Sequence, residues 1–258
     1  MIKLNRVYYD IRWLLRGLCF PVRWWNFYCL LRSINNRQYQ CFTLNSEDVF
    51  IVPSCTNPGD WNAAKVKEKS HTALIRHQEL CETFQSIRHF YPDAIIFNLE
   101  SSLLPQWMKE KHITLSDYWI DLSDSLPIKI ANSFPNKGIP EVTMLITVLR
   151  GIKRGKEVKR IHKLSGRYRL TGCFLADVSE PGLYLHLYQS HDSVSTRYLV
   201  YNEVSVEQIL ENLQPTLFDM VPGRSLEGVI HRKGSLTKYF VDSLGVCGMV
   251  NGVVFISE

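Results

Sequence analysis

The chain has 258 residues, which suits one domain of the larger sort or a domain with an accessory segment. Apolar residues make up 45% and charged residues 21%, and Gly and Pro are scattered singly, so the composition argues against a disordered chain. The seven cysteines lie at least eight residues apart and form no CxxC pair, which argues against a zinc knuckle and a disulfide framework. We therefore expect reduced, core-packed cysteines in a cytosolic protein.

The net charge of +5 is concentrated near the N-terminus. Residues 1–40 contain seven basic residues against Asp10 alone, whereas the rest of the chain contains 23 basic and 24 acidic residues. Such an asymmetry is expected of a segment that meets phosphate groups, either those of lipid headgroups or those of nucleic acid.

The N-terminal segment has the pattern of an amphipathic helix followed by an aromatic stretch. Residues 2–19, wound as a helix, place apolar side chains in one arc and basic side chains in the other. Residues 22–32 are rich in Trp and Tyr, which favour the headgroup level of a bilayer. Arginines interrupt every apolar stretch of about 18 residues, so neither a transmembrane helix nor a signal peptide is expected.

We predict that residues 1–45 form a basic, aromatic segment and that residues 1–40 lie on an anionic membrane surface. One alternative is an amphipathic helix that packs on the protein's own core. Nucleic-acid binding is the other, but the remaining chain is almost neutral, so we expect no nucleic-acid partner. The expected location is cytoplasmic and peripheral, on the inner face of the cell membrane.

Residues 46–258 have the alternating pattern of a single α/β domain with a mainly parallel central sheet. We predict strands at 48–53, 93–100, 118–121, 158–164, 183–188, 196–201 and 249–256, and helices at 72–90, 103–110, 139–152, 205–213 and 223–243. The strands at 183–188 and 196–201 are expected to be antiparallel. In an open α/β sheet, ligands bind at the carboxyl ends of the strands.

Polar residues gather at those carboxyl ends. They are Thr56 and Asn57 after the first strand, Glu100 at the second, Asp121 at the third and Arg167 after the strand at 158–164. The sequence has no GxGxxG after a strand and no GxxxxGK[ST], so the dinucleotide-binding and P-loop readings lack their phosphate-binding loops. It also has no GxSxG or HExxH motif of a hydrolase.

Two short segments suit a phosphate-bearing ligand. Lys137, Gly138 and Pro140 begin the helix at 139–152, where free amides and the helix dipole favour an anion. An ordinary helix cap is the alternative reading. Residues 163–169, KLSGRYR, place cations and a glycine after a strand, and an arginine fork suits a diphosphate. A solvated basic turn is the alternative there.

The run Lys163-x-Ser165-Gly166-Arg167-Tyr168-Arg169-Leu170 resembles a motif of bacterial surface-polysaccharide glycosyltransferases and their relatives in large viruses. Weaker matches occur in the same order from about residue 50 to the end, including Glu100-x-Ser102 and Lys137-Gly138-x-x-Glu141. Near the C-terminus, Glu227 precedes Leu244-Gly245-Val246-x-Gly248 and Asn251-Gly252. The N-terminal segment is not covered.

The resemblance implies a GT-A-like, Rossmann-like fold and the transfer of a sugar from a nucleotide-sugar donor to a lipid-linked glycan acceptor. The metal-binding Asp-x-Asp of most such enzymes is missing, because Asp121 and Asp124 have the wrong spacing, so we expect no metal and no cofactor. Arg167, helped by Lys163 or Lys137, would offset the charge of the leaving diphosphate. A non-catalytic nucleotide-sugar-binding module, or another α/β nucleotide-dependent transferase, remains the alternative.

The implied site residues fall into two groups. The candidate catalytic bases are Glu227 first, then Glu100 and Asp121. The implied donor-binding residues are Thr56, Asn57, Arg76, Asn132, Lys137, Gly138, Lys163, Ser165, Gly166, Arg167 and Tyr168.

Overall fold

The computed structural model describes residues 20–57, 72–154, 158–172, 178–187, 194–232, 234–241, 243, 245–250 and 254–257. The expected helix at 2–19 lies outside the described residues. The division of the chain at residue 45 stays a prediction.

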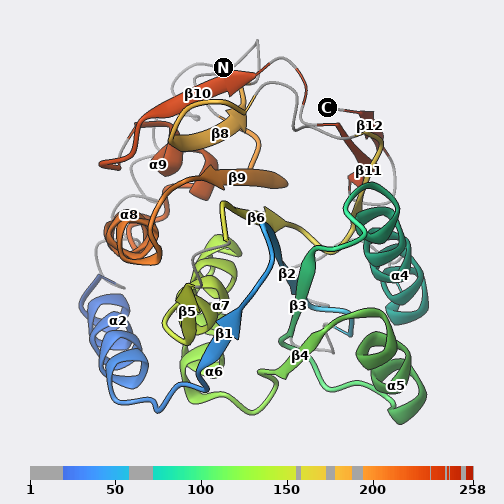
Figure 1. Cartoon of the computed structure of the whole chain (residues 1–258). Coiled ribbons are helices and arrows are strands. Elements are labelled where there is room, and N and C mark those ends of the chain that lie inside the picture. The colour runs from blue at the N-terminus through green and yellow to red at the C-terminus, as the bar shows by residue number, and fades with distance from the viewer. Residues whose placement is uncertain are drawn as a thin grey trace, which may run out of the picture.

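A seven-stranded sheet runs through the molecule (Figure 1). Its strand order is β10-β8-β9-β6-β2-β3-β4, and only β9 runs against its neighbours. The predicted α/β class with a mainly parallel central sheet is therefore confirmed, and so is the antiparallel pairing of β8 with β9. The strands are β2 (Asp48–Ser54), β3 (Ile95–Glu100), β4 (Tyr118–Asp121), β6 (Arg160–Leu164), β8 (Gly182–His186), β9 (Tyr198–Asn202) and β10 (Lys238–Val241).

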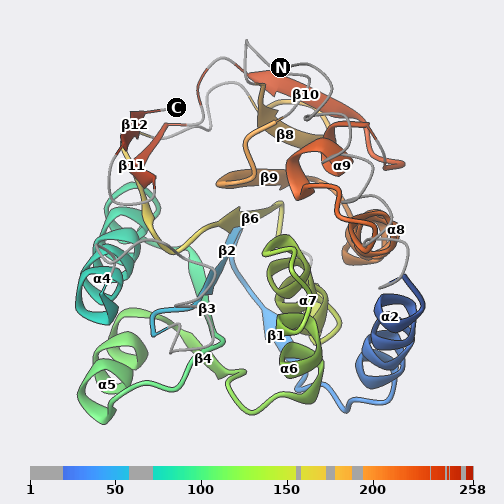
Figure 2. The same cartoon turned by 180° about the vertical axis from the view of Figure 1, so that it is seen from behind.

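Helices cover both faces of this sheet, as Figures 1 and 2 show from opposite sides. One face is covered by α4 (Ala73–Phe90) and α5 (Gln106–Leu115), and the other by α6 (Leu126–Asn132) and α7 (Gly138–Leu149). Further helices pack outside α6 and α7, namely α2 (Phe20–Asn35), α8 (Val206–Met220) and α9 (Leu226–Arg232). Side chains of β2 alternate between the faces: Val49 and Ile51 join the core under α7, whereas Phe50 and Val52 join the core under α4.

Two small sheets flank the central one. Strands β1 (Phe42–Leu44) and β5 (Ile152–Arg154) pair in parallel. Strand β11 (Val246–Val250) pairs antiparallel with both β7 (Tyr168–Leu170) and β12 (Val254–Ser257), and β7 lies against α4.

Helix α2 contains the aromatic stretch of residues 22–32, which is predicted to lie at the membrane surface. Its inward side chains Phe27, Leu30 and Ile34 are buried in the core, so this helix contributes to the packing of the domain. On its outer side, Trp25 and Tyr28 are 65% and 55% exposed. Among the described residues, none of the helices has both the length and the apolar character needed to cross a bilayer.

Two predictions near the C-terminus are wrong. The helix expected over 223–243 ends as α9 at Arg232, and β10 follows at Lys238. Gly234 between them has φ +116°, a left-handed conformation that breaks a helix, and β10 is rich in aromatic and β-branched residues. The single strand expected over 249–256 is instead two antiparallel strands, β11 and β12. The Asn251-Gly252 pair between them is a hairpin signal in the sequence.

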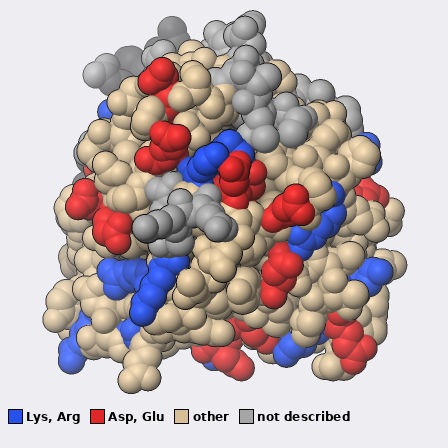
Figure 3. All heavy atoms as spheres, in the orientation of Figure 1, with Lys and Arg blue, Asp and Glu red and all other residues tan. Residues whose placement is uncertain are grey.

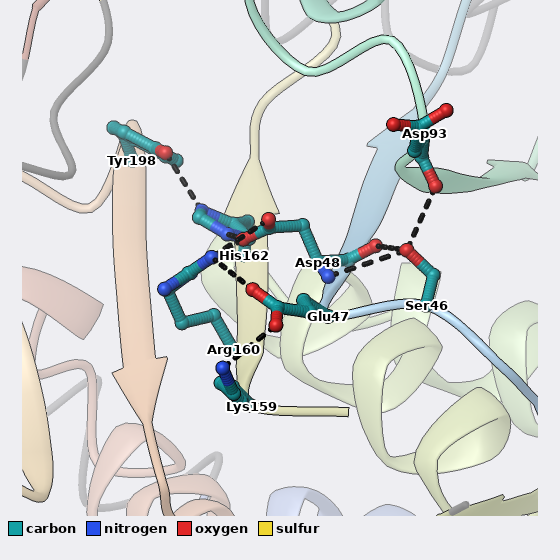
Figure 4. Close-up of polar contacts among 8 residues, drawn as sticks. All are labelled: Ser46, Glu47, Asp48, Asp93, Lys159, Arg160, His162 and Tyr198. Atoms are coloured by element: carbon teal, nitrogen blue, oxygen red, sulfur yellow. Dashed lines mark hydrogen bonds and ion pairs between the residues drawn. The ribbon is translucent and has the colours of Figure 1, made fainter. Parts of the chain in front are cut away.

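A partly buried charged cluster joins β2 to β6 at their amino ends (Figure 4). The carboxylate of Asp48 accepts hydrogen bonds from Arg160 at 2.6 and 2.9 Å and lies 2.8 Å from Nε2 of His162. Burial lowers the pKa of His162, and Asp48 only partly offsets this effect. A neutral His162 that donates to Asp48 from Nε2 accepts at Nδ1 from the hydroxyl of Tyr198, 2.7 Å away on β9.

Replacing Asp48 by asparagine is expected to lower the free energy of unfolding at neutral pH by about 3 kcal/mol, because Arg160 loses a largely buried charged partner. Burial alone would raise the pKa of Asp48, but hydrogen bonds from Arg160 and His162 bring it well below its ordinary value. Because the folded-state pKa is lower than the unfolded one, Asp48 stabilises the fold above about pH 4 and loses this effect as the pH falls further.

The measurement is urea unfolding of both proteins from neutral to acidic pH. The stability gap between wild type and Asp48→Asn should narrow below about pH 4. Glu47→Gln is the matched control, because Glu47 contacts Lys159 and Arg160 but is 54% exposed, and it should change stability little. A stability difference that does not change with pH would contradict the conclusion that the pKa of Asp48 is lower in the folded protein than in the unfolded chain.

Candidate functional site

The polar residues predicted at the carboxyl ends of β2, β3 and β4 come from adjacent strands. Ser54, Glu100 and Asp121 occupy matching register positions on these three parallel strands. Side chains in register on neighbouring strands point to the same face, and here that is the face covered by α4 and α5.

Glu100 is the centre of this edge, and its side chain is fully buried. Its carboxylate accepts hydrogen bonds from the amide and hydroxyl of Thr56 at 3.1 and 2.6 Å, from Ser54 Oγ at 2.7 Å, and from the amide and hydroxyl of Ser102. These five hydrogen bonds occupy the acceptor positions of both carboxylate oxygens. Glu100 therefore fixes the segments that follow β2 and β3 against each other.

The segment after β2 is held further by side chains from outside the strand. The amide of Asn57 donates to Ser102 Oγ at 2.8 Å, and Arg76 of α4 donates to the carbonyl oxygen of Cys55 at 3.0 Å. Burial raises the pKa of the Cys55 thiol and Glu100 raises it too, whereas Arg76 and Arg167 lower it. Both guanidinium groups are therefore close enough to the end of β2 to act electrostatically there.

Lys163 lies at the carboxyl end of β6 but on the opposite face of the sheet, under α7. It is 1% exposed, and its ammonium forms an ion pair with Glu141 of α7. The same ammonium donates to Ser165 Oγ at 2.8 Å and to the carbonyl oxygen of Thr196. Its charge is thus used inside the fold, where it anchors the turn that begins at Ser165.

Glu227 joins this second cluster through Thr196. The hydroxyl of Thr196 donates to Glu227 Oε1 at 3.1 Å, and Glu227 lies in the first turn of α9, where it is half-buried. Leu226 beside it contacts the start of α7, since a Cβ built on Gly138 would lie 3.0 Å from Leu226 Cβ. The beginnings of α7 and α9 therefore meet at the end of β6.

The turn formed by residues 165–168 connects the two clusters. The amide of Gly166 donates to the carbonyl oxygen of Pro53 at 3.3 Å, which places the turn against the end of β2. A Cβ on Gly166 would lie 2.7 Å from Leu80 Cδ1 of α4 and 3.3 Å from Ser54 Cβ, so a larger residue here would have to displace the side chain of Leu80. Tyr168 is buried beside α4, and the guanidinium of Arg197 lies 5.5 Å from its ring centre.

Arg167 emerges from this turn and is half-buried. Within the part of the chain that the structure describes, its guanidinium has no hydrogen-bond or ion-pair partner. A cation held at the carboxyl edge of a parallel sheet, with its donors unused, can bind a phosphate or diphosphate group.

The remaining predicted residues lie outside these contacts. Asp121 is exposed, accepts from the amide and hydroxyl of Ser123, and lies 3.6 Å from the ammonium of Lys109. Lys137 is exposed before α7, and Asn132 lies in the last turn of α6. The amide of Gly138 is occupied by the side chain of Asn136 at 3.0 Å, so the predicted helix-start anion site has one free amide fewer.

Several residues of the two clusters are not among the predicted site residues. Ser54 and Ser102 hold Glu100, and Thr196 connects Lys163 with Glu227. Ser102 and Glu141 occur in the sequence only as parts of motifs, and Lys163, the partner of Glu141, is 22 residues away from it. A lysine in a buried strand signals a required acidic partner, and that signal could have led to Glu141.

No protein-family model matches the sequence, and no curated protein matches it at a significant level. Among solved structures, the glycosyltransferase GlyE of Streptococcus pneumoniae TIGR4 is similar over 77% of this chain, with 10% identity and a TM-score of 0.43. That similarity covers 46% of GlyE, so the chain spans less than half of its length.

Two further structures have comparable similarity. A protein of Desulfovibrio desulfuricans G20, described as a nucleotide-diphospho-sugar transferase, is 8% identical with a TM-score of 0.45, over 76% of this chain and 80% of its own. Mouse xyloside xylosyltransferase 1 is 9% identical with a TM-score of 0.38, over 73% of this chain and 80% of its own.

Proposed function

We propose that this chain is a glycosyltransferase that moves a sugar from a nucleotide-sugar donor to a lipid-linked glycan acceptor, as in bacterial surface-polysaccharide synthesis. The observation that carries the proposal is the turn at 165–168, which presents Arg167 at the carboxyl edge of the parallel sheet beside the end of β2. The sequence resemblance through the same residues supports the choice of sugar transfer.

In the proposed reaction, an acceptor hydroxyl oxygen bonds to the anomeric carbon of the donor sugar while the bond from that carbon to the diphosphate breaks. The nucleoside diphosphate leaves with added negative charge, and Arg167 stabilises that charge without a metal ion. Lys163 is a positioning residue in this scheme, because its ammonium holds the turn through Ser165. Exposed Lys137 is a further cation that could approach the phosphates from the start of α7.

Glu227 is the proposed base for an inverting transfer. Within the described residues only its Oε1 atom has a hydrogen-bond partner, which leaves Oε2 to accept the proton of the acceptor hydroxyl. Glu100 suits this role less well, because five hydrogen-bond donors already surround its carboxylate.

Donor binding is the direct test of the proposal. A donor at about 100 times its dissociation constant stabilises a protein by about 2.7 kcal/mol, which for a chain of this size raises the melting temperature by about 5–10 °C. We expect one of the UDP-, GDP-, CMP- or TDP-sugars to produce such a shift in a thermal-melting screen, and Arg167→Ala to lose it. The proposal fails if none of the donors shifts the melting temperature. A shift without turnover on any acceptor would identify a non-catalytic binding module instead.

The outer side of α2 supports the proposed membrane contact. Trp25 and Tyr28 are exposed there with their rings 5.9 Å apart, and the buried side of the helix is separate from them. Figure 3 shows acidic and basic side chains interspersed on the face that it draws, so this face does not form the continuous basic surface that nucleic acid would need.

Replacing both Trp25 and Tyr28 by serine is expected to reduce flotation of the protein with vesicles that contain an anionic phospholipid, while the melting temperature stays nearly unchanged. Leu74→Ser is the matched control, because Leu74 is 59% exposed on α4, and it should float like wild type. If the double variant floats as well as wild type, α2 does not contribute to the proposed membrane contact.

A further inference from the structure

A cluster of three side chains between α4 and α5 has the composition of a metal site. His77 and Cys81 are four residues apart on α4, and His112 projects from α5. His77 Nδ1 lies 2.9 Å from His112 Nε2, and Cys81 Sγ lies 3.8 Å from His77 Nε2. One ligand atom from each of the three residues can be chosen so that all lie within 4.8 Å of one another.

The cluster lies in an aromatic environment. His77 and His112 are 8% and 0% exposed, and the rings of Trp107 and Trp119 lie 5.0 Å from His77 and 5.6 Å from His112. The Nδ1 atom of His112 is buried and has no hydrogen-bond partner in the described part of the chain. The nitrogen of His112 that faces His77 is Nε2, so the unsatisfied Nδ1 is not the atom that His112 offers to the cluster.

We propose that His77, Cys81 and His112 bind one divalent transition-metal ion of the zinc class, which joins α4 to α5. Two imidazoles and one thiolate, with no carboxylate among them, are ligands that such ions prefer. Tetrahedral binding with metal–ligand distances of about 2.0–2.3 Å separates ligand atoms by roughly 3.4–3.6 Å. His77 now faces His112 through Nδ1 and Cys81 through Nε2, and one ion takes only one of these nitrogens, so binding requires the side chains to rotate toward these separations. Water can complete the fourth position because Cys81 is half-buried.

The proposed ion is structural and is separate from the sugar-transfer chemistry. It is connected to the site through Arg76, which precedes His77 on α4 and holds the carbonyl oxygen of Cys55. Joining α4 to α5 would restrict the movement of the helix that carries Arg76.

Titration of the metal-free protein with cobalt tests the proposal, because Co²⁺ replaces Zn²⁺ and reports its ligands in the absorption spectrum. We expect a near-ultraviolet thiolate-to-cobalt band and the visible bands of tetrahedral cobalt at one equivalent. Cys81→Ser should lose the thiolate band, and His112→Gln, which removes a ligand, should weaken cobalt binding by more than the roughly 10–100-fold that is typical of losing an outer-shell partner.

Two matched controls separate this site from other thiols and imidazoles. Cys41→Ser removes an exposed cysteine, and His89→Gln removes an exposed histidine from the same helix; both should keep the spectrum. Zn²⁺ alone should raise the melting temperature of wild type and of both controls, but not of Cys81→Ser. A wild-type protein without the thiolate band, or a band that persists in Cys81→Ser and disappears in Cys41→Ser, overturns the proposal.

Discussion

Arg167→Ala is expected to lower kcat for sugar transfer by on the order of 10²–10³-fold, the range typical for removing one preorganised group that stabilises developing charge. The side chain of Arg167 is half-buried at the carboxyl edge of the sheet, where a cation acts on the leaving diphosphate more strongly than it would in bulk water. Steady-state kinetics with the donor that the thermal screen identifies would measure the loss.

Arg169→Ala is the matched control for this substitution. Arg169 is two residues further along the same segment, but its side chain is 51% exposed and faces Glu82 at 3.6 Å, so its removal should leave kcat nearly unchanged. Equal losses in both variants would mean that general positive charge, and not Arg167, supports the reaction.

Chelation distinguishes an arginine from a metal as the group that stabilises the diphosphate. Activity should survive EDTA, and the assay is best repeated in Cys81→Ser, where the proposed ion between α4 and α5 no longer contributes. Strict dependence on Mg²⁺ or Mn²⁺ in that variant would contradict the metal-independent scheme.

The helices and strands that could be predicted are those whose own residues contain the pattern that identifies them. Residues 48–53 form a continuous apolar run, which is typical of a strand buried on both faces, and β2 is buried in this way. Because ligands bind at the carboxyl ends of parallel strands, the sequence also predicts that Glu100 lies beside the end of β2. In the structure, Glu100 is in register with Ser54, the last residue of β2. Strand β10 does not follow from the sequence, because the pattern of residues 223–243 predicts one helix that continues across Gly234.

The roles of the buried charges could not be predicted, because they depend on partners far apart in sequence. Glu100 and Asp121 look equivalent as carboxylates that end neighbouring strands. Only the folded chain shows that Ser54, Thr56 and Ser102 converge on Glu100, while Asp121 stays exposed. The same limit applies to His77 and His112, which are 35 residues apart and meet only because α4 packs on α5.

Glu100→Gln shows what is expected when the substituted carboxylate has a structural role and not a catalytic one. The amide of glutamine would place a donor among the hydroxyls and amides that now donate to Glu100, at a position that is fully buried. We therefore expect a loss of unfolding free energy on the order of 3 kcal/mol, visible in urea unfolding, so any lost activity would follow from lost structure.

Glu227→Gln is expected to lower kcat by on the order of 10²–10⁴-fold while leaving donor affinity and melting temperature close to wild type. The amide keeps the size of the side chain and can still accept the hydrogen bond from Thr196, but it cannot take a proton from the acceptor hydroxyl. The measurement combines kcat with the donor-induced thermal shift. Asp121→Asn is the control, because this exposed carboxylate lies on the other side of the sheet and should be dispensable. If Asp121→Asn abolishes turnover and Glu227→Gln does not, the base belongs to β4 and the role of α9 is confined to packing.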